Sequence, residues 1–307
     1  MTHESWTVTG PRTIGVEHVA LLDATVIGGR IDVVAHEDPA QTDVVVEVHS
    51  VTGRALEVAV DGTTLRIGYG SYEAGWKGFL ERFRTYTGKD AADVHVAVPA
   101  TTYAKVVTVQ GEGLVAGLRN GVRVGTVTGS VMTSRTAGEL RVDTVSGEVS
   151  ASEHDGTVRM ESVSGGLTAT GALRSLRLES VSGAVTVDTR TTPSEVSVSA
   201  VSADVLVRLP DPDAMSYAIR CVSGRLLVDG TEQRSAAGSF SRPAQHGPAA
   251  SVRVSAVSGN VTVLRGSFEE DAERSSTDAP GRATGDGPAW GTPGARARAA
   301  ASGPVDR

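Results

Sequence analysis

The chain has 307 residues, of which 21% are charged, and a formal net charge of −7. This mild acidity gives no overall positive field, so we expect no binding to nucleic acid or to an anionic lipid surface. No apolar run approaches the ~18 residues that a membrane-spanning helix needs, and the opening residues, MTHESWTVTG, lack the pattern of a secretory signal. The sequence therefore predicts a protein of the cytoplasm without a transmembrane segment.

Residues 1–103 have the character of an N-terminal β-rich segment. Short runs of alternating apolar and polar residues predict strands at 30–35, 43–49 and 55–60, and the Gly, Asp and Pro residues between them predict turns. We expect this segment to be continuous with the repeats that follow it.

One stretch of this segment, near 72–84, has the spacing of an amphipathic helix, because aromatic side chains recur there every three or four residues. The candidate interaction residues of the sequence lie here: Tyr72, Trp76, Phe79 and Phe83. We expect this short helix to pack on the rest of the protein, as a cap or along its side. Binding to a partner or to a membrane surface is the alternative that its amphipathic character leaves open.

Residues 104–266 form a repeat. The first five repeat glycines lie 18 residues apart, and the pattern then continues at intervals of 20, 21 and 35 residues, with Ala203 in place of a glycine. The structural repeat glycines are Gly111, Gly129, Gly147, Gly165, Gly183, Gly224 and Gly259. The segment therefore holds about eight related units.

Apolar residues occupy fixed offsets from each glycine. Positions 7, 5 and 2 before it and 2 and 4 after it are apolar in 38 of 40 cases, and around Gly183 they are Leu176, Leu178, Val181, Val185 and Val187. Each unit is then a strand, a corner and a second strand. Identical corners at a fixed spacing predict an all-β, parallel single-stranded β-helix (a β-solenoid) whose coils stack in chain order. We accordingly expect Val181→Asp to unfold several coils, because it would bury an unpaired charge.

Two further columns follow from the same alignment. The residue three positions before each glycine is small, which indicates crowding at the corner: Thr108, Thr126, Thr144, Ser162, Ser180, Ala200, Cys221 and Ala256. The residue directly before the glycine is usually a serine or threonine, whose hydroxyl can bond to the backbone at the turn. A serine that recurs in every unit, with no histidine at a fixed offset, is not expected to be a nucleophile.

Two stretches depart from the repeat. Residues 229–250 are rich in small and polar residues and predict a loop insertion, and residues 267–307 are rich in Gly, Pro, Ala and charge and predict a disordered tail.

The sequence predicts no catalytic, cofactor-binding or metal site. The histidines are scattered, Glu153, His154 and Asp155 are typical of a solvated turn, and Cys221 belongs to the small corner column. A polysaccharide-cleaving enzyme would need carboxylates that converge on one face. The outward column directly after each glycine does not provide them: Glu112, Ser130, Glu148, Gly166, Ala184, Asp204, Arg225 and Asn260.

The units TVSGEV, SVSGGL, SVSGAV, CVSGRL and AVSGNV, the opening WTVTGPRTIGVEHV and the later RLPD resemble a bacterial family of unknown function. Its members are β-strand-repeat proteins that carry the label adhesin. The resemblance covers about residues 6–265. It implies a β-strand-repeat fold and display outside the cell, and it supplies no catalytic residues. The predicted fold is also similar in plan to that of the bactofilins, cytoskeletal β-helices that polymerise end to end.

From these observations we expect a non-enzymatic scaffold or protein-interaction module that binds an unknown protein partner or associates with itself. An adhesin-like surface-binding protein is the first alternative, and a carbohydrate-active β-helix enzyme is the second. No cofactor is expected.

Overall fold

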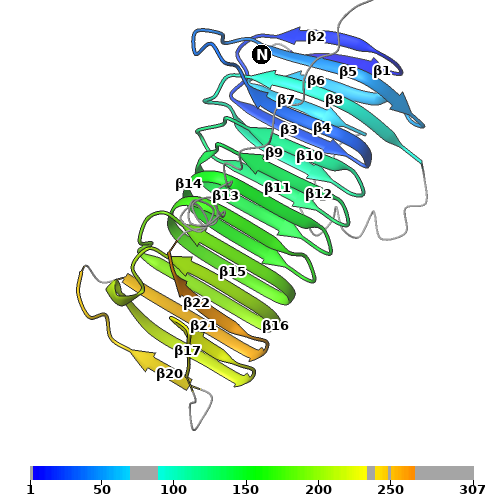
Figure 1. The fold of residues 1–307 in the computed structure, drawn as a ribbon. Helices are drawn as coiled ribbons and strands as arrows, with labels where there is room; N and C mark the ends of the chain where they lie inside the picture. The colour runs from blue at the N-terminus through cyan, green and yellow to red at the C-terminus, as the bar shows by residue number, and fades with distance from the viewer. Residues whose placement is uncertain (1–2, 70–88, 234–238, 248–249, 267–307) are drawn as a thin grey trace, which may run out of the picture.

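The computed structural model describes residues 3–69, 89–233, 239–247 and 250–266. These residues form one sheet of 22 strands. Figure 1 shows the sheet rolled on itself, with strands stacked in successive turns from the N-terminal strands to the C-terminal ones. A single apolar cluster fills the interior along the whole stack.

The strands before the repeat are β1 (His3–Val8), β2 (Arg12–Val16), β3 (Leu21–Val26), β4 (Gly28–Ala35), β5 (Val44–Thr52), β6 (Leu56–Asp61), β7 (Thr64–Gly68) and β8 (Ala91–Val98). The strands predicted at 30–35, 43–49 and 55–60 are confirmed as β4, β5 and β6.

The first strands of the repeat region are β9 (Tyr103–Thr108), β10 (Glu112–Ala116), β11 (Val122–Thr126), β12 (Ser130–Ser134), β13 (Ala137–Thr144), β14 (Glu148–Ser162), β15 (Leu167–Thr189) and β16 (Glu195–Leu209). The 3₁₀ turn η1 (Pro212–Ala214) follows. The last strands are β17 (Met215–Ser223), β18 (Leu226–Val228), β19 (Thr231–Glu232), β20 (Ser239–Arg242), β21 (Ala250–Ser258) and β22 (Val261–Arg265).

The rolled sheet has two sides that face each other across the core. We call the first the β10 side; its strands pair in the order β2, β5, β8, β4, β10, β12, β14, β15, β16, β22, β18 and β19. We call the second the β11 side; its order is β1, β6, β7, β3, β9, β11, β13, β14, β15, β16, β21, β17 and β20. The long strands β14, β15 and β16 continue through the bend and contribute to both sides.

The middle of the stack is parallel, and its register reproduces the repeat. Residue pairs such as Val124 with Val142 and Val142 with Met160 are 18 positions apart. The same spacing relates Val131 to Val149 on the β10 side. Equivalent apolar residues of successive units therefore lie above one another.

The expected fold class is nevertheless wrong. The sheet is of mixed orientation, because β1–β6, β6–β7, β2–β5, β5–β8, β17–β20 and β18–β19 are antiparallel pairs. The described residues contain no α-helix, and the helix predicted near 72–84 lies outside them. A wholly parallel β-helix is thus overturned for the part of the chain that the structure describes. The connections explain the difference, since a two-residue turn such as 62–63 between β6 and β7 permits only an antiparallel pair.

Four of the five predicted core columns are confirmed. The residues 7 and 5 before the repeat glycines, and those 2 and 4 after them, are buried in all eight units. Burial of each valine or leucine side chain contributes about 1.5–3 kcal/mol. The core of the repeat therefore rests on these four columns.

The fifth column, two residues before the glycine, lies in the core in the first unit, where Val109 is 4% exposed, but from the fourth unit onward its valines are exposed. Val181 and Val201 are each 50% exposed, so the expectation that Val181→Asp unfolds several coils is wrong. The small residue at the preceding position points inward instead, as Thr126 (0% exposed) and Thr144 (2%) show. Strand residues alternate between faces, and the inward positions 7 and 5 before the glycine continue to position 3, not to position 2.

The bend itself is built from that small residue and the glycine. Thr144 Oγ1 accepts a hydrogen bond from the Gly147 amide (3.1 Å), and Ser162 Oγ accepts one from the Gly165 amide (2.9 Å). A Cβ on Gly147 would collide with the Gly129 carbonyl oxygen of the preceding turn and with the Thr126 side chain. The glycine is required here because two turns of backbone approach closely.

The last two units do not stack in chain order. Strand β21 pairs with β16 on one edge and with β17 on the other, so the eighth unit lies between the sixth and the seventh. Figure 1 shows β21 and β22 between β16 and β17. Strand β20, which belongs to the insertion at 229–250, pairs with the outer edge of β17. This antiparallel strand ends the stack on the β11 side.

Candidate functional site

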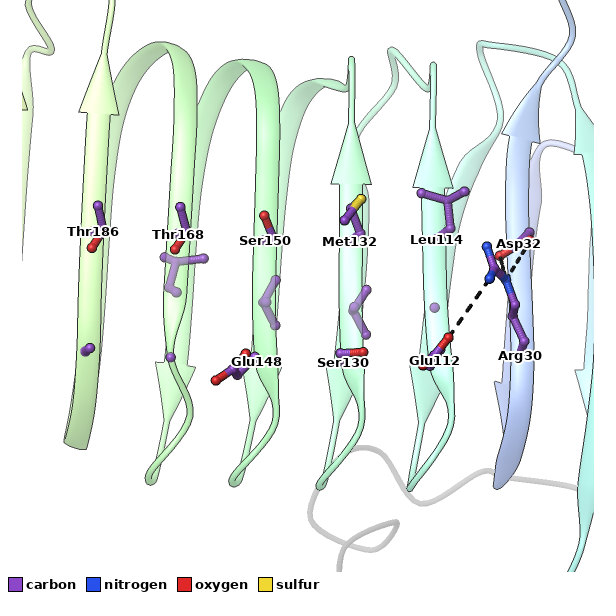
Figure 2. Close-up of a pocket in the computed structure, with 16 residues that line it drawn as sticks. Arg30, Asp32, Glu112, Leu114, Ser130, Met132, Glu148, Ser150, Thr168 and Thr186 are labelled. Carbon is purple, nitrogen blue, oxygen red and sulfur yellow. Dashed lines mark hydrogen bonds and ion pairs between the residues drawn. The ribbon is translucent and has the colours of Figure 1, made fainter. Parts of the chain in front are cut away.

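A groove of about 540 Å³ lies on the outer surface of the β10 side. Its lining side chains come from β4, β10, β12, β14 and β15, and Figure 2 shows them in two rows across the strands. The upper row is Asp32, Leu114, Met132, Ser150, Thr168 and Thr186, and the lower row is Arg30, Glu112, Ser130, Glu148, Gly166 and Ala184.

The rows follow directly from the parallel register. Leu114 pairs with Met132, and Met132 pairs with Ser150, so residues at one offset in the repeat form a line across the strands. At one end of the lower row the residues are Gly166 and Ala184, whose small side chains make the surface shallow there. The groove is therefore a surface of the stacked repeat and depends on several turns being in register.

One end of the groove is charged. The Arg30 guanidinium donates from Nε to both carboxylate oxygens of Asp32 at 2.9 Å, and its Nη1 lies 4.0 Å from Glu112 Oε2. The hydrogen bond to Asp32, with the nearby carboxylate charges, raises the pKa of Arg30 above its ordinary value. The groove as a whole holds three carboxylates and one guanidinium, with Glu148 as the third carboxylate.

The centre of the groove is apolar. Met132 is 52% exposed and is the longest apolar side chain of the groove. Leu114 and Ser150 lie beside it on the two neighbouring strands, and Ser130 lies two residues before it on its own strand. This arrangement offers an apolar contact in the middle of a polar and acidic surround.

The ionisable side chains of the groove are spread across several strands. Glu112 and Glu148 lie two strands apart with Ser130 between them, and no histidine, lysine or cysteine is among the described residues that line the groove. The arrangement suits binding along an extended surface.

A second cluster of charges lies at the C-terminal end. Asp213 accepts hydrogen bonds from Arg265 (2.5 Å) and Gln245 (3.1 Å), and Asp211 lies 2.7 Å from His246. The hydrogen bond from His246 lowers the pKa of Asp211. These contacts connect η1 to β22 and to the segment after β20, so the cluster fastens the end of the stack.

Beside that cluster, Tyr217 donates its hydroxyl to the Pro212 carbonyl at 2.8 Å, and the Arg242 guanidinium lies 4.7 Å from the Tyr217 ring centroid. Burial raises the pKa of Tyr217 to about 12. The tyrosine is neutral at physiological pH and serves as a packing and hydrogen-bonding residue for the covering strand β20.

The residues singled out from the sequence have different outcomes. Tyr72, Trp76, Phe79 and Phe83 lie outside the described residues. The repeat glycines lie at the bends, as Gly129 and Gly183 illustrate, where a Cβ would meet the glycine carbonyl of the neighbouring turn. Cys221 is partly buried, and its thiol contacts the Ser223 carbonyl at 3.3 Å.

The hydroxyls directly before the glycines do bond to the backbone of the preceding turn. Thr128 Oγ1 donates to the Val109 carbonyl at 3.2 Å, and Ser182 Oγ donates to the Val163 carbonyl at 3.3 Å. His154, expected in a solvated turn, is instead 1% exposed, and its Nδ1 lies 3.0 Å from Thr136 Oγ1. Burial lowers the pKa of His154.

The groove residues were not identified as a site from the sequence. Apart from Arg30, the lower row is the outward column directly after each repeat glycine, and in this region that column contains two carboxylates, Glu112 and Glu148. The signal that was missed is Met132, a large apolar residue at an outward position where four other units carry serine or threonine and three carry leucine.

Among the described residues, no group of three or more His, Cys, Asp or Glu side chains is arranged to hold a metal ion. A search of the same residues for helices long and apolar enough to cross a membrane found none.

Comparison with protein families identifies the chain. The Toastrack DUF4097 profile matches residues 30–264, and the chain therefore belongs to this family. Its expected membership in a family of unknown function is confirmed. No curated protein matches the chain.

Three solved structures are similar to it. A "putative cell adhesion protein" from Clostridium sporogenes is 9% identical, with a TM-score of 0.29, and the match covers 83% of this chain and 100% of that one. A "putative lipid binding protein" from Parabacteroides distasonis is 11% identical, with a TM-score of 0.43 and coverage of 84% and 95%. A "putative adhesin" from Bacteroides fragilis is 16% identical, with a TM-score of 0.39 and coverage of 86% and 97%.

Proposed function

We propose that this member of the Toastrack DUF4097 family is a non-enzymatic interaction module that binds an extended segment of a partner protein in the groove of its β10 side. The observation that carries the proposal is the exposed Met132 at the centre of two rows of outward side chains on five strands. Met132 and the adjacent Leu114 form a small apolar patch with a polar rim, and apolar patches rimmed by polar residues mark interaction surfaces.

The dimensions of the groove suit an extended chain. Its rows cross six strand positions, which at about 4.8 Å between strands corresponds to a length of about 24 Å. An extended peptide of about seven residues has that length. The partner segment would place an apolar side chain on Met132 and Leu114 and main-chain groups near Ser130 and Ser150.

The charge of the groove indicates the character of the partner. Three carboxylates face one guanidinium, and that guanidinium is already engaged by Asp32. A partner segment that carries lysine or arginine near its apolar residue would be attracted, whereas an acidic segment would be repelled.

The proposal is tested by photo-crosslinking in the native cell. Benzoylphenylalanine is placed at Met132 in one strain and, as a control, at Arg174, a 69% exposed side chain away from the groove, in another. A protein adduct found at position 132 and not at position 174 is the expected result. Equal adducts at both positions, or none at position 132, would contradict the proposal.

Charge reversal then separates groove binding from adventitious contact. Glu112→Lys together with Glu148→Lys is expected to weaken the adduct at position 132 strongly, because it reverses the sign of the groove. Glu57→Lys, an exposed change on β6 of the β11 side, should leave the adduct unaltered. Loss of the adduct in both variants would mean that overall charge, and not the groove, is responsible.

An adhesin-like role is the second candidate, and the hydroxyl groups of Ser130, Ser150, Thr168 and Thr186 favour it, because they offer hydrogen bonds to a glycan. Location separates the two functions. Protease treatment of intact cells that carry the tagged protein would leave an intracellular scaffold protected, whereas cleavage would favour the adhesin-like role.

A further inference from the structure

A second exposed surface lies on the β11 side, opposite the groove. Six large hydrophobic side chains are exposed among the described residues, and five of them are the valines two positions before the repeat glycines. The first of these valines directly follows β14, and the others lie on β15, β16, β21 and β17. In spatial order they are Val163, Val181, Val201, Val257 and Val222.

The valine row is the last of three parallel rows on this surface, which we call the valine face. The middle row, two residues earlier on each strand, is Glu161, Glu179, Ser199, Ser255 and Arg220. The outer row, two residues earlier again, is Arg159, Arg177, Ser197, Arg253 and Ala218. Since residues two apart on a strand point the same way, all three rows face outward together.

The middle row changes sign from one end to the other. It is acidic on β14 and β15, neutral on β16 and β21, and basic on β17, where Arg220 is exposed. This gradient exists only because the eighth unit is inserted, which makes β17 the last strand of the repeat. The row is therefore complementary to itself when its order is reversed.

We propose that two copies of the chain associate through the valine face, with a two-fold axis that runs along β16. Such an axis reverses the order of the strands, so that Val201 meets Val201 of the second copy and Val163 meets Val222. Glu161 then lies against Arg220 of the second copy, and the reciprocal pair forms by symmetry. An isologous contact requires this kind of self-complementary surface.

The alternative orientation is disfavoured by charge. With an axis across the strands, the order is kept, and each strand meets its own equivalent. Glu161 would then face Glu161 and Arg220 would face Arg220, and like charges across an interface are destabilising. In the outer row the proposed axis places Arg177 opposite Arg253 of the second copy, and the pairing of Arg253 with Glu195 at 2.5 Å offsets part of that like-charge contact.

The size of the face sets the strength of the association. Five strands about 4.8 Å apart and five residues along each strand enclose about 250 Å², well below the roughly 800 Å² per partner of a stable complex. Association of this kind falls in about the micromolar to millimolar range and weakens with salt. The second copy leaves the groove on the β10 side free.

Sedimentation velocity of the full chain tests the proposal, with loading concentrations from about 10 µM to about 1 mM. The weight-average sedimentation coefficient is expected to rise with concentration in the native chain and to stay monomeric in Val201→Lys. Because Val201 is 50% exposed, this variant should keep the native melting temperature. A native chain that remains monomeric throughout would overturn the proposal.

Charge exchange tests the orientation. Glu161→Arg and Arg220→Glu, prepared separately, should each weaken self-association about tenfold or more, which corresponds to one like-charge contact per half of the interface. An equimolar mixture of the two variants should associate again, because the arginine introduced at position 161 of one chain then meets the glutamate introduced at position 220 of the other. Failure of the mixture to associate, when each variant alone is weakened, would overturn the reversed order.

Discussion

The middle turns and the C-terminal end of the molecule are built from the same repeat but assemble differently. From β9 to β16 the units are almost evenly spaced, and the order of strands in space is their order in the sequence. Beyond β16 the last unit moves inward, and a short antiparallel strand closes the β17 edge. The units therefore stack in chain order where their spacing is even, and the strand order changes beside the insertion at 229–250.

The middle and the ends of the stack also differ in how their strands pair. A parallel stack exposes unpaired backbone at each end, and such edges promote uncontrolled association. Here both ends finish in antiparallel pairs, β1–β6 and β2–β5 at the N-terminal end and β17–β20 and β18–β19 at the other. At the C-terminal end the outermost strands β19 and β20 have only two and four residues, so the edge that they leave for pairing with another chain is short.

The largest effect is expected from a charge in the core of the middle turns. Leu178→Asp places an unpaired carboxylate at a 0% exposed position with stacked neighbours on both sides and should cost several kcal/mol, about 4 or more. The equivalent change near the end, Ile219→Asp, should open β17 and β20 and leave the rest folded, because units in a stack contact only their neighbours.

Urea unfolding followed by circular dichroism, with residue-resolved hydrogen exchange, measures both changes. Val181→Asp is the matched control, since this side chain is half exposed, and its cost should stay within about 1 kcal/mol. A Val181→Asp chain as unstable as Leu178→Asp would contradict the outward position of the valine row.

The glycines of the two regions should also respond differently. Gly147→Ala in the middle introduces a Cβ that collides with the Gly129 carbonyl and the Thr126 side chain, and we expect a loss of about 2–3 kcal/mol. Gly230→Ala, in the turn between β18 and β19, meets no atom within 4 Å and has a φ of +75°. Its cost should be only about 1–2 kcal/mol, from the left-handed backbone alone.

Thermal unfolding compares these variants directly. Equal losses of stability at the two positions would mean that close packing of the turns contributes nothing beyond the backbone conformation.

A smaller loss of stability is expected when the Thr144 hydroxyl, which accepts a hydrogen bond at the bend, is removed. Thr144→Val removes the acceptor of the Gly147 amide and should destabilise the protein by about 1 kcal/mol. At the same offset near the end, Cys221→Ser keeps a polar atom and should change stability by less than about 0.5 kcal/mol. Chemical denaturation of both variants decides whether the hydroxyl matters more where the turns are even.

As the pH falls, stability should be lost first through His154 in the middle turns and only at lower pH through Asp211 at the C-terminal end. The folded pKa of His154 lies below its ordinary value of 6.5 because the side chain is buried. The unfolded chain then binds the proton more readily, so stability falls as the pH drops below about 6.5. The depressed pKa of Asp211 acts only near and below its ordinary value of 3.8, where protonation removes its favourable contacts at the C-terminal end.

Denaturant midpoints measured from pH 8 to pH 5 test this order. The dependence of the midpoint on pH should largely disappear in His154→Gln, and Asp211→Asn should leave that dependence unchanged. A dependence that persists in His154→Gln would assign the effect to another group.

Much of the core could be predicted from the sequence because the repeat fixes which residues stack. Leu140, Val142 and Val149 are buried where the periodicity placed them. The exposed valine row could not be found by hydrophobicity, because valine also suits a strand exposed to solvent. Attention to the strict alternation from Leu178 through Ser180 would have shown that Val181 points outward.

The site and the ends were less predictable. The groove depends on side chains such as Arg30 and Met132, which are 102 positions apart in the sequence and line the same groove only through the register of β4, β10 and β12. Strand β21 lies between β16 and β17, whose sequences follow the same repeat pattern. Nothing in the local sequence of either unit determines that position.

The position of the last unit is the claim on which the valine face and the ending of the stack both depend. Ser202 and Ser258 are paired, with their hydroxyl oxygens 3.1 Å apart, whereas Ser223 is paired with Ser258 and lies one strand beyond it. In a Cys221→Ser background, oxidation of Ser202→Cys/Ser258→Cys should give an internal disulfide, seen as a mass loss of two hydrogens. Ser202→Cys/Ser223→Cys, about 9.6 Å apart by strand spacing, should not. A disulfide in the second variant and none in the first would mean that the units stack in chain order and would contradict the account.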